Sequence, residues 1–323
     1  MTRDRWAPER TQPNKNSIVT SHAAPFDRLT SDTIGSARES MSHQLPTITV
    51  VTASLNAQPF LSYTAASVLS QTLPGVQWIV VDGASCNGTV GWFQQVYGDK
   101  EDVVFISEPD QGVYHAWNKA IPYIKGDWVI FLGAGDKLKS PDVLATCAAW
   151  LAATPDQFNV AYGFVEYICD PAQLSGTPSK ARWEGIDGTW SWCRPVMPNH
   201  QGVFHRATFI RDNAGFDVSY LIAADAALLL PELMTRGALE MPVTVTLRLE
   251  NGLSLDIQNR TLVLREFMRI NGGVGLRYRR MPYQCLAYVY HWLKARKAEF
   301  VMGLETVPSL FAGSSARQPK DSD

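Results

Sequence analysis

The chain has 323 residues, of which 46% are apolar and 19% charged, so a sizeable core is expected and wholesale disorder is excluded. A net charge of −2 and a pI near 6.3 argue against a general nucleic-acid-binding protein. The five cysteines are odd in number and lack CxxC spacing, which favours reduced thiols in a cytoplasm over a disulfide framework or a zinc site. No apolar run is long enough to cross a membrane and no signal peptide is evident, so a cytoplasmic protein is expected.

Composition divides the chain into three parts. Residues 1–44 are rich in Arg, Ser, Thr, Pro and Asp without periodicity, which predicts a disordered or weakly ordered tail. Residues 45–256 carry the apolar patterns of a folded domain. Residues 257–323 are expected to form a helical, basic extension with a disordered end.

Within the central part, β-branched apolar runs alternate with amphipathic stretches. Strands are predicted at residues 47–54, 76–85, 102–110 and 127–136, and helices at residues 60–72, 89–97 and 112–124. This alternation predicts βαβ units and an α/β fold with a mainly parallel sheet. Further along the chain we expect helices at residues 141–153 and 224–234, strands at residues 158–168 and 243–250, and a long loop at residues 171–194.

Polar side chains stand where the four early strands are predicted to end: Asn56, Asp82, Glu108, Asp110 and Asp136. Ligands bind beyond the carboxyl ends of the strands in open α/β sheets, so one rim would collect these groups. Such a rim suits Mg²⁺ or Mn²⁺ held together with substrate phosphates, and hydrogen bonds to ribose, although turn chemistry alone is the structural alternative. The glycine-rich motifs GxGxxG and GxxxxGK[ST] are missing, which favours diphosphate binding through a metal.

A series of motifs in a fixed order resembles the family 2 nucleotide-sugar glycosyltransferases, in particular the bacterial branch that builds exopolysaccharide and lipopolysaccharide. The motifs are "TVVTASLNA", "SVLSQT", "VVDGASCNGT", "ISEPDQGVYHAWNKAI", "GDWVIFLGAGD", "NHQGVFHR", "FDVSYLIAADAALLL" and "NGLSLD". The resemblance implies a GT-A fold, with a Rossmann-like central sheet flanked by helices and a C-terminal helical extension. It also implies that a sugar moves, with inversion, from a nucleoside-diphosphate sugar to a hydroxyl of a glycan or lipid-linked acceptor.

The resemblance assigns the donor side by position. Asn56, Asp82 and Asp110 would surround the donor nucleotide, and Lys119 would meet the diphosphate unless it is simply solvated on its helix. Asp136 would be the remaining acid of a DXD-type motif and a ligand of Mg²⁺ or Mn²⁺. Gly135 replaces the second acid that most relatives carry, which puts metal dependence in question.

The resemblance also assigns an acceptor side. Asp225 matches the position where these enzymes often place the general base, and capping the following helix is the structural alternative. His200 and Gln201 would lie on the acceptor or metal side, against the alternative of an ordinary core histidine. The tryptophans of residues 171–194 suit either a sugar or lipid acceptor or a cover for the core.

Three further alternatives stay open at this point. The basic, amphipathic C-terminal segment favours either a peripheral contact with an anionic membrane or packing on the domain with a solvated face. A sugar nucleotidyltransferase would share the sheet and the metal, but "ASLNAQPF" after the first strand offers no glycine-rich, basic loop. A glycosyltransferase-like subunit that binds a partner without turnover would show no metal-dependent binding of a nucleoside diphosphate.

Overall fold

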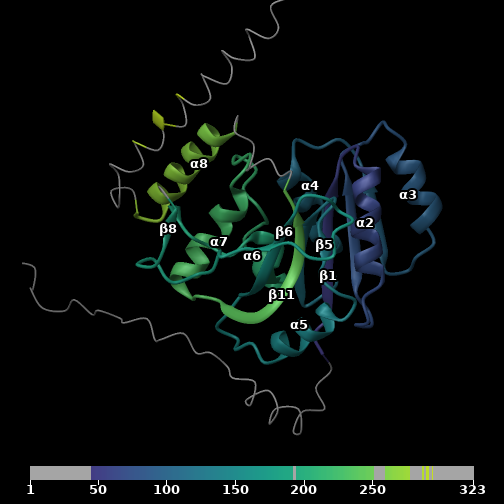
Figure 1. Ribbon diagram of the computed structural model, residues 1–323, viewed down its shortest axis with the longest axis horizontal. Helices are drawn as coiled ribbons and strands as arrows, with labels where there is room; N and C mark the ends of the chain where they lie inside the picture. Colours follow the sequence, from purple (N-terminus) through teal and green to yellow (C-terminus); the bar gives the residue numbers. More distant parts are fainter. Residues whose placement is uncertain are drawn as a thin grey trace, which may run out of the picture. The chain divides into compact units, whose positions relative to one another are not determined.

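The computed structural model describes residues 45–191, 194–250 and 259–276, together with residues 286, 289, 290 and 293 (Figure 1). Its helices are α2 (Gln58–Leu69), α3 (Thr89–Tyr97), α4 (Val113–Ala120), α5 (Val143–Ala152), α6 (Ala207–Asp212), α7 (Ala224–Thr235) and α8 (Arg260–Gly273), with 3₁₀ turns η1 (Ile121–Tyr123) and η2 (His200–Gly202). Its strands are β1 (Ile48–Ser54), β2 (Gln77–Asp82), β3 (Val103–Ser107), β4 (Trp128–Gly133), β5 (Lys137–Leu138), β6 (Val160–Ile168), β7 (Thr177–Pro178), β8 (Trp190–Ser191), β9 (Arg194–Pro195), β10 (Val203–Arg206) and β11 (Leu239–Leu249). The expected tail at residues 1–44 and most of the C-terminal extension lie outside the described residues.

The main sheet has nine strands, ordered β3-β2-β1-β4-β10-β6-β11-β5, with β7 paired to β6. The first four strands are parallel neighbours, and β11 runs parallel to β6. β10 runs antiparallel to both β4 and β6, and β5 runs antiparallel to β11. The mainly parallel α/β sheet expected from the sequence is therefore confirmed.

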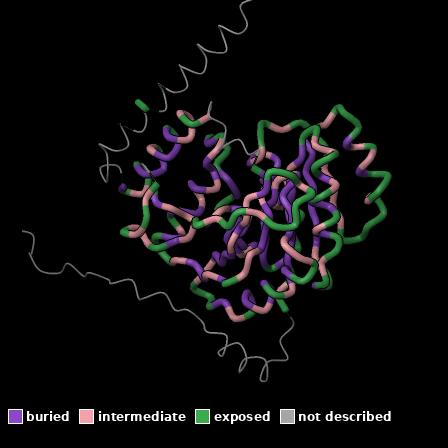
Figure 2. The backbone as a smooth tube through the Cα atoms, viewed as in Figure 1, coloured by how far each residue is buried: buried purple, intermediate pink, exposed green. Residues whose placement is uncertain are grey.

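Helices cover both faces of this sheet. Trp78 and Ile79 are neighbours on β2 and point to opposite faces. Trp78 packs on Phe93 of α3 with ring centroids 5.5 Å apart, whereas Ile79 joins the core cluster that includes residues of α4, α6, α7 and α8. Strands buried on both faces need continuous apolar runs, which is why β1 and β2 lack a polar alternation. Figure 2 shows buried backbone along the strands of this sheet.

Outside the loop expected at residues 171–194, the sequence patterns do not predict β5, α6 or β10. β5 has two residues and α6 has six, so neither is long enough to show a period. β10 has four residues and interrupts the parallel order between β4 and β6. Its position depends on pairing with strands that are far away in the sequence, and a local pattern cannot show that.

The loop expected at residues 171–194 is irregular apart from short strand pairs. Trp183 is 4% exposed and belongs to the core cluster. Trp190 packs against the same cluster and donates its indole N–H to the carbonyl of Ile186 at 2.9 Å. The surroundings of Trp183 and Trp190 therefore match the alternative in which these side chains cover the core. Trp192 lies outside the described residues.

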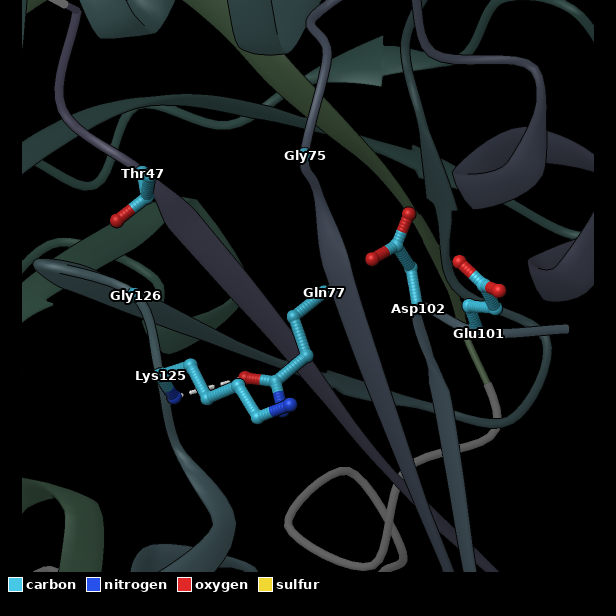
Figure 3. Close-up of a pocket in the computed structure, with 7 residues that line it drawn as sticks. All are labelled: Thr47, Gly75, Gln77, Glu101, Asp102, Lys125 and Gly126. Atoms are coloured by element: carbon cyan, nitrogen blue, oxygen red, sulfur yellow. Dashed lines mark hydrogen bonds between the residues drawn. The ribbon is translucent and has the colours of Figure 1, made fainter.

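A small hollow of about 110 Å³ lies at the amino-terminal ends of the parallel strands (Figure 3). Gln77 organises it: the side-chain oxygen accepts the hydroxyl of Thr49 and the N–H of Lys125, each at 2.8 Å, and the amide donates to the carbonyl of Tyr123. These bonds join the starts of β1 and β2 to the segment before β4. Gln77 in this hollow therefore has a structural role, since its hydrogen bonds hold the strand ends together. The hollow lies at the edge of the sheet opposite to the candidate site.

Candidate active site

The pairing register brings the carboxyl ends of four parallel strands to one edge of the sheet. Ser54 of β1 lies opposite Asp82 of β2, and Asp82 lies opposite Ser107 of β3. On the other side of β1, Ala53 lies opposite Gly133 of β4. The polar residues expected at these strand ends therefore follow a single edge, where open α/β sheets bind ligands.

Asp82 is fully buried at the end of β2 and holds the loop that follows it. Its Oδ2 accepts the N–H of Ser85 at 2.7 Å and the hydroxyl of Ser107 at 3.0 Å. A buried carboxylate is stable where N–H and O–H groups satisfy it in this way. Asp82 thus fixes the loop between β2 and α3 over the end of the sheet, and its contact with a nucleotide stays a prediction.

Asn56 joins the same loop from β1. Its φ of 52° lies in the left-handed region, which Asn adopts more readily than most residues. Its N–H donates to Oγ of Ser85 at 2.6 Å, and its side-chain oxygen accepts the N–H of Cys86 at 3.0 Å. The structure therefore brings Asn56 and Asp82 together through Ser85.

Asp110 lies against the backbone at the end of β2. A Cβ added at Gly83 would be 2.7 Å from Oδ2 of Asp110, so the close approach requires glycine there. The other carboxylate oxygen accepts the N–H of Gly112 at 2.9 Å, just before α4 begins. The three residues predicted to surround the donor nucleotide, Asn56, Asp82 and Asp110, are thus all linked to the segment that follows β2.

Lys119 ties α4 to the loop before it. Its ammonium group donates to the carbonyls of Pro109 at 2.7 Å and Glu108 at 3.2 Å, and it lies 3.2 Å from the carboxylate of Glu108. Its three N–H groups therefore have three acceptors within the protein. A contact between Lys119 and a diphosphate stays a prediction, and it requires one of these bonds to be exchanged.

Asp136 closes the turn after β4. Its Oδ2 accepts the N–H of Gly133 at 2.9 Å, and its Oδ1 accepts the N–H of Leu249 of β11 at 3.0 Å. Asp136 is 5% exposed, and burial raises the pKa of its carboxyl although the two N–H groups oppose the shift. One side chain therefore joins two strands that are not neighbours in the sheet.

Asp225 lies half-buried in the first turn of α7. Its Oδ1 is 2.9 Å from the hydroxyl of Tyr114 and accepts the N–H of Ala226 at 2.8 Å, so the capping alternative is met in part. Its Oδ2 has no hydrogen-bond partner among the described residues. Burial raises the pKa of the Asp225 carboxyl, opposed by these hydrogen bonds and by the charges of Arg194 and Arg248. A carboxylate with a raised pKa and a free oxygen has the properties of a general base.

Helix α4 connects the donor-side loops to Asp225. Asn118 donates to the carbonyl of Phe216 and accepts the N–H of the same residue, each at 2.8 Å. One turn earlier, Tyr114 reaches Asp225, and at the end of the helix Lys119 holds the loop that carries the donor-side acid. The sequence shows the helical spacing of these polar residues but not the partners that each one binds.

The family model described as Glycosyl transferase family 2 matches residues 49–222, more than half of the chain. The chain belongs to glycosyltransferase family 2. It is 29% identical over 203 residues to an uncharacterised glycosyltransferase of Mycobacterium tuberculosis, a match that covers 62% of this chain and 72% of the relative. It is 26% identical over 182 residues to a PGL/p-HBAD biosynthesis glycosyltransferase of Mycobacterium bovis, covering 56% and 67%. It is 36% identical over 101 residues to the putative teichuronic acid biosynthesis glycosyltransferase TuaG of Bacillus subtilis, covering 31% and 40%.

Two solved glycosyltransferases share the fold of this family 2 enzyme. Residues 1–349 of S. aureus TarS in complex with UDP-GlcNAc have a TM-score of 0.55 and 14% identity, covering 81% of this chain and 76% of that TarS segment. The mannosyltransferase PcManGT of Pyrobaculum calidifontis, in complex with GDP-Man and Mn²⁺, has a TM-score of 0.52 and 17% identity, covering 82% of each chain. At these identities the likeness establishes the fold, and the expected GT-A architecture is confirmed. Membership of the family sets aside the sugar nucleotidyltransferase alternative.

The residues around Asp136 fit a divalent ion only together with the donor. Among the residues that the structure describes, no group of three or more His, Cys, Asp or Glu side chains is placed to hold a metal. Each oxygen of Asp136 accepts one N–H and keeps a second lone pair, which suits a single carboxylate contact to an ion bound mainly by phosphates and water. Gly135 has a φ of 103°, and a Cβ there would lie 2.9 Å from the side chain of Leu249, so a second acid does not fit at this position.

His200 of this family 2 enzyme belongs to the core. It is 5% exposed, its Nε2 lies 3.2 Å from Nε2 of His205, and its ring stacks on Phe131 with centroids 5.6 Å apart. Burial lowers the pKa of His200 to about 3, so the imidazole is neutral at ordinary pH. The surroundings of His200 therefore match the alternative of an ordinary core histidine. Any contribution of His200 to the site is made by packing against the residues that surround it.

Gln201 follows His200 in the turn η2 and is half-buried. Its carbonyl oxygen accepts the hydroxyl of Thr246 of β11 at 2.6 Å. This bond uses the backbone of Gln201 and ties η2 to β11. A role of the Gln201 side chain toward an acceptor stays a prediction.

Proposed function

We propose that this glycosyltransferase moves a sugar from a nucleoside-diphosphate sugar to a hydroxyl of a glycan or lipid-linked acceptor, in the biosynthesis of a cell-surface glycan. The observation that carries the proposal is the Asp225 carboxyl, held on one oxygen by Tyr114 while the other has no partner among the described residues. Relatives named for PGL/p-HBAD and teichuronic acid biosynthesis support the class of product. Fold neighbours solved with UDP-GlcNAc and GDP-Man support the class of donor.

In the proposed reaction the acceptor hydroxyl gives its proton to Asp225 while its oxygen attacks the anomeric carbon of the donor. The bond from that carbon to the diphosphate breaks on the opposite side, so the configuration inverts and a nucleoside diphosphate leaves. A raised pKa makes Asp225 a stronger base than an ordinary carboxylate, which favours removal of the proton. Mg²⁺ or Mn²⁺ arriving with the donor and contacted by Asp136 would neutralise charge on the departing diphosphate.

Exposed apolar side chains on the segment that leads into α7 favour a lipid-linked acceptor. Val218 is 50% exposed and Leu221 is 57% exposed, and Asp225 follows a few residues later. A purely polar glycan would gain nothing from these side chains, whereas a lipid chain would remove them from water. The acceptor proposed for this site is therefore a sugar or hydroxyl carried on a lipid.

Thermal unfolding with UDP, GDP, dTDP and CMP, each with and without Mn²⁺, tests the donor side. One nucleoside diphosphate is expected to raise Tm by several degrees, because a ligand at 100 times its Kd adds about 2.7 kcal/mol to the free energy of unfolding. The shift is expected to be larger with Mn²⁺, and Asp136→Ala is expected to remove that increment. Absence of a shift with any nucleotide would contradict the donor assignment and favour a partner-binding subunit without turnover.

The donor-side residues offer a matched pair of variants for this test. Asp110→Ala is expected to abolish most of the nucleotide shift, because Asp110 lies against Gly83 at the candidate edge. Asp102→Ala removes a carboxylate that lines the hollow at the opposite edge, so it is expected to leave the shift unchanged (Figure 3). An equal loss of shift in both variants would contradict the placement of the donor.

We further propose that the C-terminal segment contacts an anionic membrane. Leu286, Val289, Tyr290 and Leu293 are helical, at least half exposed and spaced as one face of a helix. Basic residues such as Arg280 and Lys294 accompany them in the sequence, a combination typical of helices that lie on anionic lipid. None of the helices in the part of the chain that the structure describes has the length and apolarity needed to span a bilayer.

Flotation with vesicles tests the membrane proposal. Binding to vesicles that contain phosphatidylglycerol is expected to exceed binding to neutral phosphatidylcholine vesicles and to weaken with salt. The double variant Leu286→Ser, Leu293→Ser is expected to lose at least about tenfold in binding, since each buried Leu contributes roughly 1.5–3 kcal/mol. Leu174→Ser is the matched control, because Leu174 is an exposed leucine of the loop that follows β6 and is not part of this segment. Equal binding by both variants would count against the proposal.

A further inference from the structure

Glu266 of α8 is buried against the turn that precedes Asp225. It is 6% exposed, and its carboxylate accepts three consecutive backbone N–H groups: from Leu221 at 2.6 Å, Ile222 at 3.0 Å and Ala223 at 2.8 Å. Hydrogen bonds to an ionised carboxylate are roughly twice as strong as neutral ones. A single side chain therefore fixes the whole turn that leads into α7.

Tyr114 of α4 holds the same turn through its hydroxyl, which is 2.6 Å from the carbonyl oxygen of Ile222 and 2.9 Å from Oδ1 of Asp225. A phenol has one proton, so it donates fully to only one of these two acceptors. When Asp225 is ionised, the proton favours the carboxylate. When Asp225 has taken a proton on Oδ2, Oδ1 is left as a neutral and weaker acceptor, so the phenol proton shifts toward the carbonyl of Ile222.

The carbonyl of Ile222 therefore receives a stronger hydrogen bond from Tyr114 when Asp225 is protonated than when it is ionised, and this change recurs in each reaction cycle. The N–H of Ala223, which belongs to the same peptide group as that carbonyl, stays bound to Glu266 throughout, because nothing at Glu266 has to change. The peptide group is thus held at its N–H while the hydrogen bond at its carbonyl changes in strength. Without that hold, the turn and the first residues of α7 would be free to move when Asp225 titrates.

We propose that Glu266 is a positioning residue of the transfer reaction, which keeps Asp225 in place while its protonation changes; the proposal rests on the function proposed above. Helix α8 lies beside α7 and begins after residue 222, where the family match ends (Figure 1). The catalytic unit of this enzyme therefore extends past the matched residues and includes α8. The chemistry of Asp225 depends on a helix that a truncation at residue 256 would remove.

The competing explanation is that Glu266 only docks α8 on the domain. Helix α8 has other docking contacts: Arg269 lies over the ring of Tyr220 at 4.0 Å and donates to the hydroxyl of Ser219 at 2.7 Å. These contacts end one residue before the three N–H groups that Glu266 binds. Arg269→Ala is therefore a matched control, which weakens docking of the same helix and leaves the turn before Asp225 bound.

The experiment compares Glu266→Gln, Glu266→Asp and Arg269→Ala in the full chain. It follows release of UDP from UDP-N-acetylglucosamine, or of GDP from GDP-mannose, according to the nucleotide that raises Tm, with water taking the place of the acceptor hydroxyl and receiving the sugar. Glu266→Gln is expected to lower kcat on the order of 100-fold, the cost of a misplacement of about 1 Å, with donor KM unchanged. Glu266→Asp keeps the charge and is expected to restore part of that loss. Amide hydrogen exchange at residues 221–223 is expected to be faster in Glu266→Gln and unchanged in Arg269→Ala.

Three outcomes would overturn the inference alone: full kcat in Glu266→Gln, an equal loss of kcat in Arg269→Ala, or no advantage of Glu266→Asp over Glu266→Gln. In each case turnover by the wild type would uphold the proposed function. A wild type without turnover would overturn both together. If Glu266→Gln does not fold, Glu266→Asp still decides, because faster amide exchange at residues 221–223 together with a wild-type kcat would overturn the positioning role.

Discussion

Asp225→Asn is expected to lower kcat by about 10²–10⁴-fold, because a general base contributes an effect of this size. The variant is isosteric, and its amide oxygen can still accept the hydroxyl of Tyr114, so the packing around α4 and α7 is retained. What disappears is the ability of the free oxygen to take a proton from the acceptor. Nucleotide binding is expected to be unchanged, since the donor-side residues follow the ends of the parallel strands, whereas Asp225 lies on α7. Release of nucleoside diphosphate from the nucleotide sugar measures the loss.

The pH dependence of the rate also tests the role of Asp225 as the general base. Burial raises the pKa of Asp225, so the wild-type rate should rise as the pH passes that raised value and fall below it. Asp225→Asn is expected to lack this acidic limb. Asp217→Asn is the matched control, because Asp217 is an exposed carboxylate on the same segment that accepts the N–H of Ser219 at 2.9 Å. Retention of more than about a tenth of the wild-type rate in Asp225→Asn would contradict its role as base.

The parallel half of the fold could be predicted because three of its four strands, β1, β2 and β4, are buried on both faces. Burial of both faces demands β-branched runs such as residues 47–54, and the helices between the strands carry one apolar face. The antiparallel strand β10 could not be predicted in the same way. Its pairing joins residues such as Phe204 and Ile130, which no local period links, and its four residues are too short to show an alternation.

In the candidate site, too, some features could be predicted from local patterns and others could not. Asp82, Asp110 and Asp136 could be placed at one edge, since the carboxyl ends of parallel strands must meet there. Their hydrogen-bond partners could not, because the bond from Leu249 to Asp136 spans 113 residues. The role of Glu266 could not be predicted either, because Glu266 lies in a segment whose pattern indicates only a basic helix.

The contact of Tyr114 with Asp225 could not be predicted either, because an aromatic residue on an apolar helix face is usually a core residue. Tyr114 is in fact both: 6% exposed within the core cluster, with its hydroxyl directed at Asp225. The available signal was its spacing from Asn118, one turn later on the same face. Two polar groups on the buried side of one short helix indicate that the helix is held by specific hydrogen bonds, and the bond from Tyr114 leads to Asp225, the proposed base.

The pair His200 and His205 is expected to make the enzyme sensitive to acid. A histidine in the unfolded chain titrates near pH 6.5, whereas burial lowers the pKa of His200 to about 3 and that of His205 well below its ordinary value. Between pH 6.5 and these lowered values, the unfolded chain binds protons that the folded chain does not. The free energy of unfolding therefore falls as the pH falls, by up to about 1.4 kcal/mol per pH unit for each histidine. Above pH 6.5 this contribution is fully present.

Thermal unfolding from about pH 7 to about pH 5, the range in which histidine titrates, checks this expectation. The double variant His200→Phe, His205→Phe removes both titrating groups, so its Tm should fall much less across this range than that of the wild type. Phe131→Leu is the control, since it disturbs the ring that stacks on His200 but removes no titrating group, and it should lower Tm at every pH with the wild-type slope. The raised pKa values of Asp136 and Asp225 act with the opposite sign, because the folded chain holds those protons more tightly, but they do so in every variant. The difference between the slopes therefore isolates the histidines, and equal slopes in the wild type and the double variant would show that the pair does not titrate as its burial requires.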